Sequence, residues 1–582
     1  MTRNTERPHL GLEALEMMMK LLKSSLLGSA AALAAVGAAH AADLPVKKAI
    51  PVEFVRVCSA YGAGFFYIPG TETCLRISGR ARAEVGFQTN ENRNVGSQVG
   101  DVSLFRSLLR INMDARTQTD YGTLRAFIRL EAASRSGAFS TSGTQQRIAN
   151  AYPALGVDQF SRVQQYVNTD KAFIQFAGLT AGRASSFFDF YAHDFEFVAA
   201  TAGSDIASTN LLAYTATFGN GFSATISLED PNFRKNTVLS ASAAATTAQQ
   251  SGTSAAQIFF SNYSLSPLIL QQAANGNATI LAFQDVIERS RMPDFVGVLR
   301  YDAAWGSAQV SAAVKDINIG GAFNQGLAGA AGVALPAANS AAALAFANAR
   351  GIRGGSQTTE GFAVQGGLKI NTPFIAPGDA LYLQGAYGEG ANVYTGVTAY
   401  TGTYTQSGTP TNGGPFAQYL SDATLNPLTG RIQLAQSFSV VGSFLHYWSP
   451  SVRSAVYASY SETNYARGAR EALSLTQGII GANAGAASFV TNPALFALSP
   501  VLRDNYQIVA GANLIWSPVK DLDIGVEGNY INTGMKSGRV IDQTKTTGVN
   551  NANFAALNAA GAIKTLNNYD AAQVRFRVQR DF

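Results

Sequence analysis

Apolar and polar residues alternate along many segments of this chain. Between residues 75 and 87, one face carries Arg76, Ser78, Arg80, Arg82 and Glu84, and the other carries Leu75, Ile77, Ala81, Val85 and Phe87. Residues 105–116 and 124–131 repeat the pattern, with a tight turn at residues 118–122 between them. Successive side chains of a β-strand point to opposite faces, so this period of two predicts strands with one apolar and one polar face.

Hairpins of the same kind recur to the end of the chain. Two less regular strands are expected near residues 171–176 and 179–183, and five hairpins follow, each with glycine or proline in or beside its turn. The five hairpins span residues 212–228, 295–315, 362–387, 438–460 and 506–530. With the final strand, the pattern predicts about sixteen antiparallel strands, an even number as in bacterial outer-membrane barrels.

The connections between these strands alternate between short and long. Seven are tight turns, and eight are long: 88–103, 134–168, 186–209, 231–293, 317–359, 391–435, 466–502 and 533–569. Such loops are uncommon in compact soluble domains, whereas outer-membrane barrels combine short periplasmic turns with long extracellular loops. We therefore predict an all-β fold, a transmembrane antiparallel β-barrel. Its Ala- and Gly-rich segment 317–359 either holds a short helix or is mobile.

The final ten residues read as a barrel strand that stops on a phenylalanine. Val574, Phe576, Val578 and Phe582 share one face, and Gln573, Arg575, Arg577, Gln579 and Asp581 share the other. A closed barrel has no free edge, so its last strand can run to the terminus by pairing with the first. Arg580, the one charge on the apolar face, would lie near the membrane rim, where it costs little. We expect Phe582 to be the signal that the barrel-assembly machinery recognises.

The N-terminus has the features of a secretory signal peptide. Two lysines precede the apolar residues 26–39, and a small-x-small cleavage site follows, so residues 1–41 are expected to be removed. Three acidic residues lie upstream of the methionine run from Met17 to Met19, and acids are foreign to the start of a signal peptide. This indicates that translation begins within that run.

Residues 42–74 are expected to form an N-terminal periplasmic segment, and residues 75–582 the barrel. The segment contains the two cysteines of the chain, Cys58 and Cys74. In an oxidising compartment such a close pair predicts a disulfide, with two free thiols as the alternative. The two histidines of the mature chain lie far apart in the sequence, so neither a metal site nor a cofactor is predicted.

Composition favours a membrane barrel over the several soluble domains that 582 residues would otherwise indicate. Charged residues make up 14% of the chain, against roughly 25% in average soluble proteins. No segment after the signal peptide is apolar for the ~18 residues that a membrane-spanning helix needs. The net charge of +5 becomes +4 without residues 1–41, which hold four basic and three acidic residues. This near balance gives no reason to expect a nucleic-acid partner.

The polar faces of the first three predicted strands would place arginines on one wall of the barrel. A barrel of about sixteen strands is wide enough for a water-filled lumen. Like charges on adjoining strands repel unless they are hydrated or faced by acids. The seven arginines are Arg76, Arg80, Arg82, Arg106, Arg110, Arg125 and Arg129. We interpret them as a functional ladder, with a hydrated wall of no special role as the alternative.

The loop at residues 186–209 interleaves aromatic and acidic side chains. Exposed aromatics at this density are costly on a surface loop, so we predict that it folds into the barrel and packs on the inner wall. Its acids, Asp189, Asp194, Glu196 and Asp205, would then face the arginine wall across a constriction that sets selectivity. The alternative is an external loop that packs on its neighbours or on an adjacent subunit.

The same loop carries a weak hint of catalysis. His193 lies beside Asp194, with Ser185 and Ser186 nearby, as in a hydrolase triad. Catalytic residues are normally brought together by the fold rather than by adjacency in sequence. We therefore predict no enzymatic activity.

Three segments resemble alphaproteobacterial general porins of the rhizobial and Brucella type. Residues 55–76, VRVCSAYGAGFFYIPGTETCLR, closely resemble the opening of those proteins. Residues 178–190, GLTAGRASSFFDF, and the ending QRDF also match. The first motif is long and specific, and the resemblance extends over essentially the whole mature chain.

This resemblance implies a sixteen-stranded homotrimeric pore whose third extracellular loop forms the constriction. It assigns acidic roles to Asp189, Asp194 and Glu196, opposite the arginines named above. It also adds Arg183, in the second motif, to the basic wall. Cys58 and Cys74 match the cysteine pair of the family.

We predict an outer-membrane porin that passively conducts small hydrophilic solutes and ions, surrounded by lipid and lipopolysaccharide. A substrate-selective channel is one alternative and would need a continuous track of aromatic and basic side chains. A structural or adhesive barrel is another and would have a plugged or narrow lumen. The luminal arginines favour anions and the loop acids favour cations, so the sequence leaves the sign of the preferred ion open.

Overall fold

The protein is described from a computed structural model. It describes residues 56–88, 103–137, 156–157, 163–191, 193–205, 208–236, 238–239, 265–286, 288–320, 327–329, 341, 345, 348–349, 356–397, 415–416, 418, 420–477, 493–542, 545–546, 549 and 553–582. The predicted signal peptide lies outside these residues. In the described part of the chain, no helix has the length and apolar character needed to cross a membrane.

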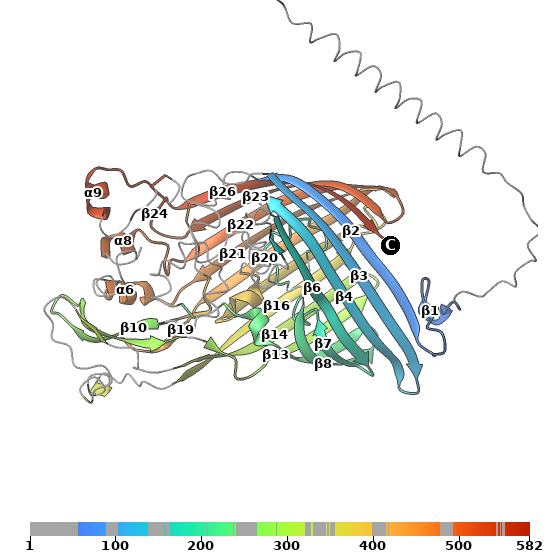
Figure 1. The fold of residues 1–582 in the computed structure, drawn as a ribbon, viewed down its shortest axis with the longest axis horizontal. Coiled ribbons are helices and arrows are strands. Elements are labelled where there is room, and N and C mark those ends of the chain that lie inside the picture. Colours follow the sequence, from blue (N-terminus) through green and yellow to red (C-terminus); the bar gives the residue numbers. More distant parts are fainter. Residues whose placement is uncertain are drawn as a thin grey trace, which may run out of the picture. The chain divides into compact units, whose positions relative to one another are not determined.

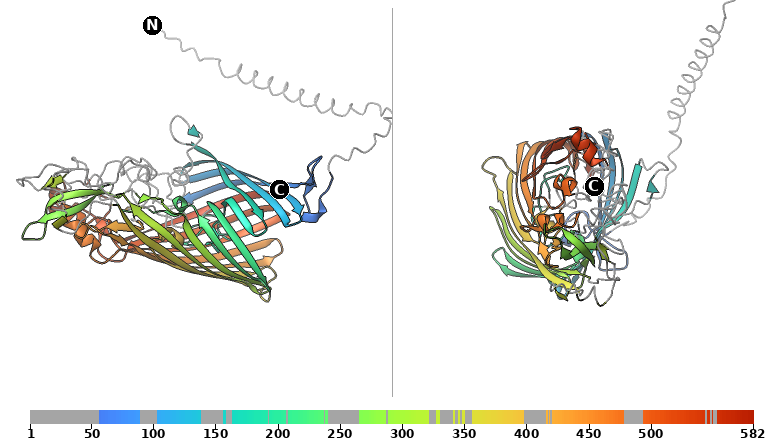
Figure 2. Two further views of the ribbon diagram at one scale, coloured as in Figure 1. Left: turned by 90° about the horizontal axis from the view of Figure 1, so that it is seen from below. Right: turned by 90° about the vertical axis from the view of Figure 1, so that its left-hand side faces the viewer.

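Sixteen antiparallel strands within the described residues close into a barrel (Figures 1 and 2). They are β2 (Cys74–Gln88), β3 (Ser103–Thr119), β4 (Gly122–Gly137), β6 (Val163–Phe176), β7 (Leu179–Ala184), β8 (Thr209–Gly219), β9 (Phe222–Glu229), β13 (Asp294–Ala303), β14 (Gly306–Ile319), β16 (Gln357–Asn371), β17 (Ala380–Glu389), β20 (Gln436–Ser449), β21 (Val452–Asn464), β22 (Asn505–Val519), β23 (Leu522–Met535) and β26 (Asn568–Asp581). Each strand pairs with the next in this order, and β26 pairs with β2. The predicted fold and strand number are confirmed.

The barrel has an apolar exterior and a polar interior. Phe87 and Phe576 are about half exposed on its outer face, at 52% and 46%, whereas Glu84 and Arg575 are buried at 1% and 3% exposure. A protein in water would place its polar side chains outside, whereas a barrel in a lipid bilayer is stabilised by an apolar band on its outer surface. The alternation in the sequence therefore becomes a lipid-facing surface and a polar lumen.

Tight turns join the strands at one end of the barrel. The hairpin from β8 to β9 turns through Gly219, Asn220 and Gly221, all with positive φ angles. A Cβ atom at Gly221 would lie 1.9 Å from the carbonyl oxygen of Asp302 in the neighbouring hairpin. Glycine is therefore required both for the left-handed backbone and for the close approach of the next turn.

The seam of the barrel joins the two ends of its sequence. Arg80 to Gln88 in β2 pair with Asp581 to Gln573 in β26. Gly79 donates its backbone N–H to Phe582 and accepts one in return, at 2.8 and 3.1 Å. A Cβ atom at Gly79 would meet the Phe582 ring at 2.4 Å, so the glycine leaves room for the terminal phenylalanine.

The N-terminal described segment folds against the tight-turn end of β2. It contains the 3-10 helix η1 (Ser59–Tyr61) and β1 (Phe66–Tyr67), and β1 pairs with β2. Cys58 and Cys74 form the predicted disulfide and are buried with Phe65. The predicted boundary between residues 42–74 and the barrel stays a prediction.

The long connections contain more regular structure than the sequence pattern predicted. Their elements are β5 (Gly156–Val157), η2 (Pro231–Arg234), β10 (Leu265–Gln272), β11 (Ala278–Asp285), β12 (Glu288–Arg289), β15 (Leu327–Gly329), η5 (Asn392–Thr395), β18 (Ala423–Leu425), β19 (Ile432–Leu434), α6 (Ala469–Ser474), α8 (Pro493–Ala497), β24 (Val540–Ile541), α9 (Phe554–Ala559) and β25 (Thr565–Leu566). β10, β11 and β15 form a separate sheet, and Leu281 of β11 shares a buried apolar cluster with Leu473 and Phe496. The segment 317–359 lies largely outside the described residues.

One predicted loop is shorter than expected. The sequence placed the second long connection at residues 134–168, but β4 continues to Gly137 and β6 begins at Val163. Backbone pairing between these strands carries both of them beyond the point where the alternation of side chains becomes irregular.

Candidate pore constriction

The connection between β7 and β8, residues 185–208, is called L3 here, and it folds into the barrel. Its first half binds the inner wall at β14 and β16. The carbonyl oxygen of Phe188 accepts hydrogen bonds from the hydroxyl of Ser311 at 2.9 Å and the amide of Gln365 at 2.8 Å. Backbone carbonyls inside a lumen need such partners, because a dry wall would leave them unsatisfied.

The second half of L3 binds the wall near the seam. The Glu527 carboxylate of β23 accepts the backbone N–H groups of Phe197 and Val198 at 2.6 and 2.9 Å. Arg577 of β26 donates to the carbonyl oxygen of Phe197 at 2.6 Å, and its guanidinium lies 4.1 Å from the centre of the Phe197 ring. Ala202 N–H also donates to Ser459 Oγ at 2.9 Å, and Ser459 lies on β21, between β16 and β23 around the barrel. L3 is thus fastened to strands far apart around the ring.

The aromatic residues of L3 provide the packing that the sequence predicted. Three of their rings surround Tyr382 of β17, at centroid distances of 5.8, 5.2 and 5.3 Å for Phe190, Tyr191 and Phe195. A Cβ atom at Gly367 would lie only 2.3 Å from the ring of Phe190, so the glycine leaves room for that ring. The prediction that L3 folds inward is confirmed, because these rings pack against inward-facing wall residues.

Two of the four L3 acids hold the loop together. Glu196 is buried and accepts hydrogen bonds from the Tyr191 hydroxyl at 3.0 Å and from the backbone N–H groups of Ala200 and Thr201 at 2.9 and 3.2 Å. Asp189 accepts from Ser204 Oγ and from Arg234 of η2, both at 2.6 Å. Asp189 is therefore paired with a cation outside the predicted arginine wall, and Glu196 is held by neutral donors within L3.

The other two acids lie closer to lumen water. Asp194 is exposed and Asp205 is half-buried. Asp205 faces Nδ1 of His193 at 3.2 Å, and Nε2 of His193 faces the carbonyl oxygen of Thr201 at 2.9 Å. Burial opposes a charged imidazole, but Glu196, Asp205 and the Thr201 carbonyl outweigh it and raise the pKa of His193 to about 9. With two acceptors facing its two nitrogens, the ring is a doubly donating imidazolium.

These contacts do not join His193, Asp194 and the neighbouring serines as a triad. Both ring nitrogens of His193 bind acceptors, and neither partner is a serine. Ser186 donates instead to Glu229 at 2.7 Å, and Ser185 accepts from Lys171. Among the described residues, no group of three or more His, Cys, Asp or Glu side chains could hold a metal ion.

Seven of the predicted arginines line the inner face of β2, β3 and β4, where most form ion pairs, and Arg183 lies on β7. Arg80 pairs with Asp581, Arg106 with Glu84, Arg110 with Glu131, Arg125 with Asp114 and Arg129 with Asp170, at 2.6, 3.4, 2.7, 2.9 and 3.4 Å. Arg82 donates to Gln579 at 2.7 Å and lies 4.0 Å from Glu84. Arg76 is exposed, and Arg183 donates to Ser208 Oγ at 2.8 Å.

Sequence reasoning did not predict which acids pair with these arginines. Alternation places Glu84, Glu131 and Asp114 on the same polar faces as the arginines but assigns them no partners. Asp170 lies at a β-bulge, and Asp581 reaches Arg80 only across the seam, so both depend on strand register. Glu527, which holds L3, gave no signal beyond its polar position.

The chain matches a family model and is similar to several known proteins. The family model described as Porin subfamily matches residues 43–558. The chain is 38% identical over 214 residues to Porin Omp2b of Brucella suis and 39% identical over 215 residues to Porin Omp2b of Brucella abortus (strain 2308). These alignments cover 36% of this chain and 52% and 54% of those proteins, so the chain spans about half the length of the curated relatives it matches. Among solved structures, the outer membrane channel DcaP of Acinetobacter baumannii is 12% identical with a TM-score of 0.46, covering 89% of this chain and 99% of that one.

Proposed function

The chain belongs to the porin subfamily, and on that premise we propose that it forms a water-filled channel across the bacterial outer membrane. Small hydrophilic solutes and ions would diffuse through it passively, without a cofactor or a chemical step. The observation that carries the proposal is the closed sixteen-stranded barrel with charged side chains inside and apolar side chains outside. Charged side chains on an inner wall are costly unless water hydrates them, so such a wall favours a water-filled lumen.

We assign the constriction to the gap between L3 and the arginine-bearing wall. L3 packs against β14, β16, β17, β21, β23 and β26, which supports an opening on the side of β2, β3 and β4. Within this assignment, Asp194 and Asp205 are the acids that solutes meet, and Asp189 and Glu196 keep L3 in place. The basic side consists of Arg76, Arg80, Arg82, Arg106, Arg110, Arg125, Arg129 and Arg183.

Planar-bilayer recording of the purified protein tests the channel. Conductance that scales with the conductivity of bulk salt is expected of a water-filled pore. A correctly folded barrel that carries no current would refute the proposal. That result would favour a structural or adhesive barrel instead, a role that the separate sheet of β10, β11 and β15 at the long-loop end would suit.

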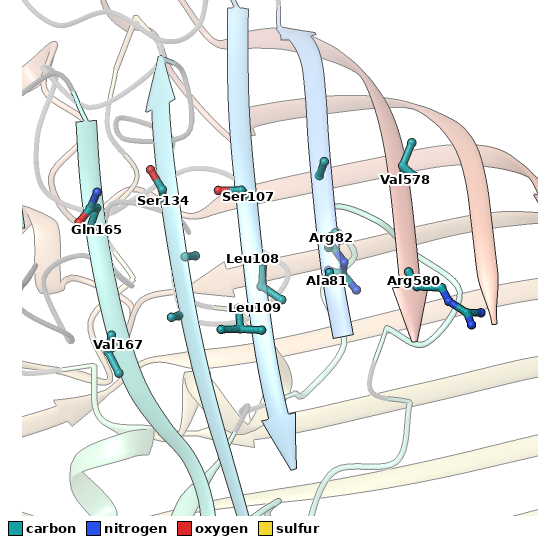
Figure 3. A pocket seen from close by; sticks show the side chains of 13 residues that line it. Ala81, Arg82, Ser107, Leu108, Leu109, Ser134, Gln165, Val167, Val578 and Arg580 are labelled. Carbon is teal, nitrogen blue, oxygen red and sulfur yellow. The ribbon is translucent and has the colours of Figure 1, made fainter. Parts of the chain in front are cut away.

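We also propose that the protein is a homotrimer whose subunits meet over β2, β3, β4 and β6. The outer face here has a hollow lined by small side chains, with larger apolar residues around it (Figure 3). Its small lining residues include Ala81, Ala83, Ser107, Ala132 and Ser134, and Leu109, Val167, Val578, Gln165 and Arg580 also line it. Small residues allow backbones to approach closely, and serine hydroxyls facing hydrocarbon are better placed against another subunit.

Native mass spectrometry in detergent tests the trimer surface. Ala132→Trp fills the hollow and is expected to convert trimers into monomers. Val310→Trp enlarges a side chain that is 62% exposed on β14, outside the proposed interface, and should leave trimers intact. Monomers in the unaltered protein, or trimers that survive Ala132→Trp, would argue against this surface.

The remaining partners follow from the same placement. The apolar outer band would contact lipid, and the outer rim would contact lipopolysaccharide. The last strand, ending at Phe582, would be recognised by the barrel-assembly machinery. Deleting Phe582 is expected to reduce the yield of assembled barrel in outer-membrane fractions, and an unchanged yield would refute that role.

A further inference from the structure

Among the described residues, six arginines of β2, β3 and β26 form ion pairs with three carboxylates. Glu84 lies 3.4 Å from Arg106, 3.7 Å from Arg575 and 2.5 Å from Arg577, and 4.0 Å from Arg82. Arg106 and Arg110 share Glu131, at 3.6 and 2.7 Å. Arg80 binds Asp581, which is linked to Arg82 through Gln579. This connected network is here called the arginine network. Its six positive and three negative groups, together with Glu527, which interacts electrostatically with Arg575 and Arg577, give a net charge of +2.

Four arginines of the network, Arg80, Arg82, Arg106 and Arg110, are more exposed than Glu84, whereas the side chains of Arg575 and Arg577 are only 3% and 9% exposed. The side chain of Glu84 is fully buried, whereas those of Arg82 and Arg106 are 14% and 11% exposed. Glu131 is 13% exposed and Arg110 is 24% exposed. Glu131, at 13%, is slightly more exposed than Arg106, at 11%, and Asp581, at the tight-turn end, is more exposed than Arg80. A solute passing this wall therefore meets the guanidinium groups of Arg80, Arg82 and Arg110 together with Asp581, and the charge of Glu84 lies behind them.

The excess continues onto the next strands. Arg116 and Arg125 share the single carboxylate of Asp114, at 2.8 and 2.9 Å. These arginines are 28% and 27% exposed, against 11% for the acid. The positive surface thus extends from the seam across β3 and β4.

L3 offsets little of this charge. Asp189 is paired with Arg234, and Glu196 is enclosed by its four donors. Asp205 faces the imidazolium of His193. Asp194 is the exposed acid of L3, and it interacts electrostatically with Lys369 of β16. The two sides of the constriction are therefore unequal, and the positive side carries more uncompensated charge.

We propose that this channel prefers small anions and that the arginine network is the group that selects them. The inference rests on the proposed channel function and adds the solute class. Guanidinium groups pair with carboxylates and phosphates through two parallel hydrogen bonds, so small organic and inorganic oxyanions match this wall best. Lumen charge of one sign concentrates counter-ions of the other sign and thereby sets ion selectivity.

The test is the reversal potential of the unaltered protein under a tenfold KCl gradient. At ~0.1 M salt, where charges act over roughly 10 Å, the net positive charge of the network predicts a chloride-to-potassium permeability ratio above one. The ratio should fall toward one at about 1 M salt, where screening shortens that range to roughly 3 Å. A second gradient of potassium acetate should also give an anion-preferring sign.

Three variants locate the selecting group. Arg110→Gln removes a network arginine while Glu131 keeps Arg106, and it should lower the chloride preference. Asp194→Asn removes the exposed L3 acid and should raise it. Arg467→Gln makes the same change as the first variant at an exposed position between β21 and α6, and should leave the ratio unchanged.

The outcomes separate this inference from the channel itself. Conductance with a ratio at or below one would overturn the anion preference while leaving the channel in place. An anion preference that Arg110→Gln does not reduce would overturn the role of the network. A folded barrel without conductance would overturn the proposed function and this inference with it.

Discussion

Replacing Glu527 with alanine should release the second half of L3 from the barrel wall. The carboxylate is 1% exposed and accepts the backbone N–H groups of Phe197 and Val198 at 2.6 and 2.9 Å. A hydrogen bond to a charged group contributes about 1.5–3 kcal/mol, so the two together contribute about 3–6 kcal/mol to holding L3. Alanine also removes a buried charge, which offsets part of that loss. We expect a net loosening of about 2–4 kcal/mol, or a roughly 30- to 1000-fold larger detached fraction.

Two assays report this change. Open-channel current noise should rise, because a detached L3 moves into and out of the conduction path. Limited proteolysis should cut L3 in Glu527→Ala and spare it in the unaltered protein. Asp523→Ala is the matched control, since Asp523 also lies on β23 but pairs with Arg453 at 2.6 Å. If Glu527→Ala shows no more noise or cleavage than Asp523→Ala, Glu527 does not hold L3.

Three further changes probe other parts of the structure. Cys74→Ser removes a disulfide between cysteines 16 residues apart and should lower stability by about 3 kcal/mol in denaturant titrations. Because the pKa of His193 is raised to about 9, its charged imidazole stabilises L3 fully below the ordinary pKa of 6.5. This stabilisation is lost as the pH rises through about 9. Proteolysis of L3 should therefore increase across that window, and His193→Ala should abolish the pH dependence. Gly367→Ala should displace Phe190 and lower the stability of the barrel by about 1–3 kcal/mol in thermal melts. Gly366→Ala, with nothing within 4 Å of its Cβ, should lower it little.

The barrel could be predicted because the alternation of apolar and polar side chains is visible within each strand's own sequence. Each strand must present apolar side chains to lipid and polar side chains to water, so the alternation in residues 75–87 determines both the strand and the direction of its arginines. The seam could be predicted for the same reason, from the alternation that ends at Phe582. The ends of β4 and β6 were misplaced because backbone pairing continues there after the side-chain pattern becomes irregular.

The roles of the individual acids could not be predicted, because they depend on contacts between distant segments. Asp189 and Asp194 look alike in the sequence, but Asp189 meets Arg234 of a later loop and Asp194 stays exposed. Glu196 is buried because L3 turns back on itself and directs two of its own N–H groups at the carboxylate. Neither outcome follows from residue type or spacing, since each requires the folded path of L3.

The contacts of Phe197 join the constriction to the closure of the barrel. Its carbonyl oxygen accepts from Arg577 of the last strand, and the same arginine donates to Glu84 of the first strand at 2.7 Å. Arg577 is 380 residues from Phe197 and 493 residues from Glu84, and its bond to Glu84 forms only when β26 has paired with β2. Long-range pairing of this kind is slow, because the chain must lose loop entropy before the contacts compensate for it. L3 therefore shares Arg577 with the seam, and a substitution that weakens the seam should alter ion flow as well as stability.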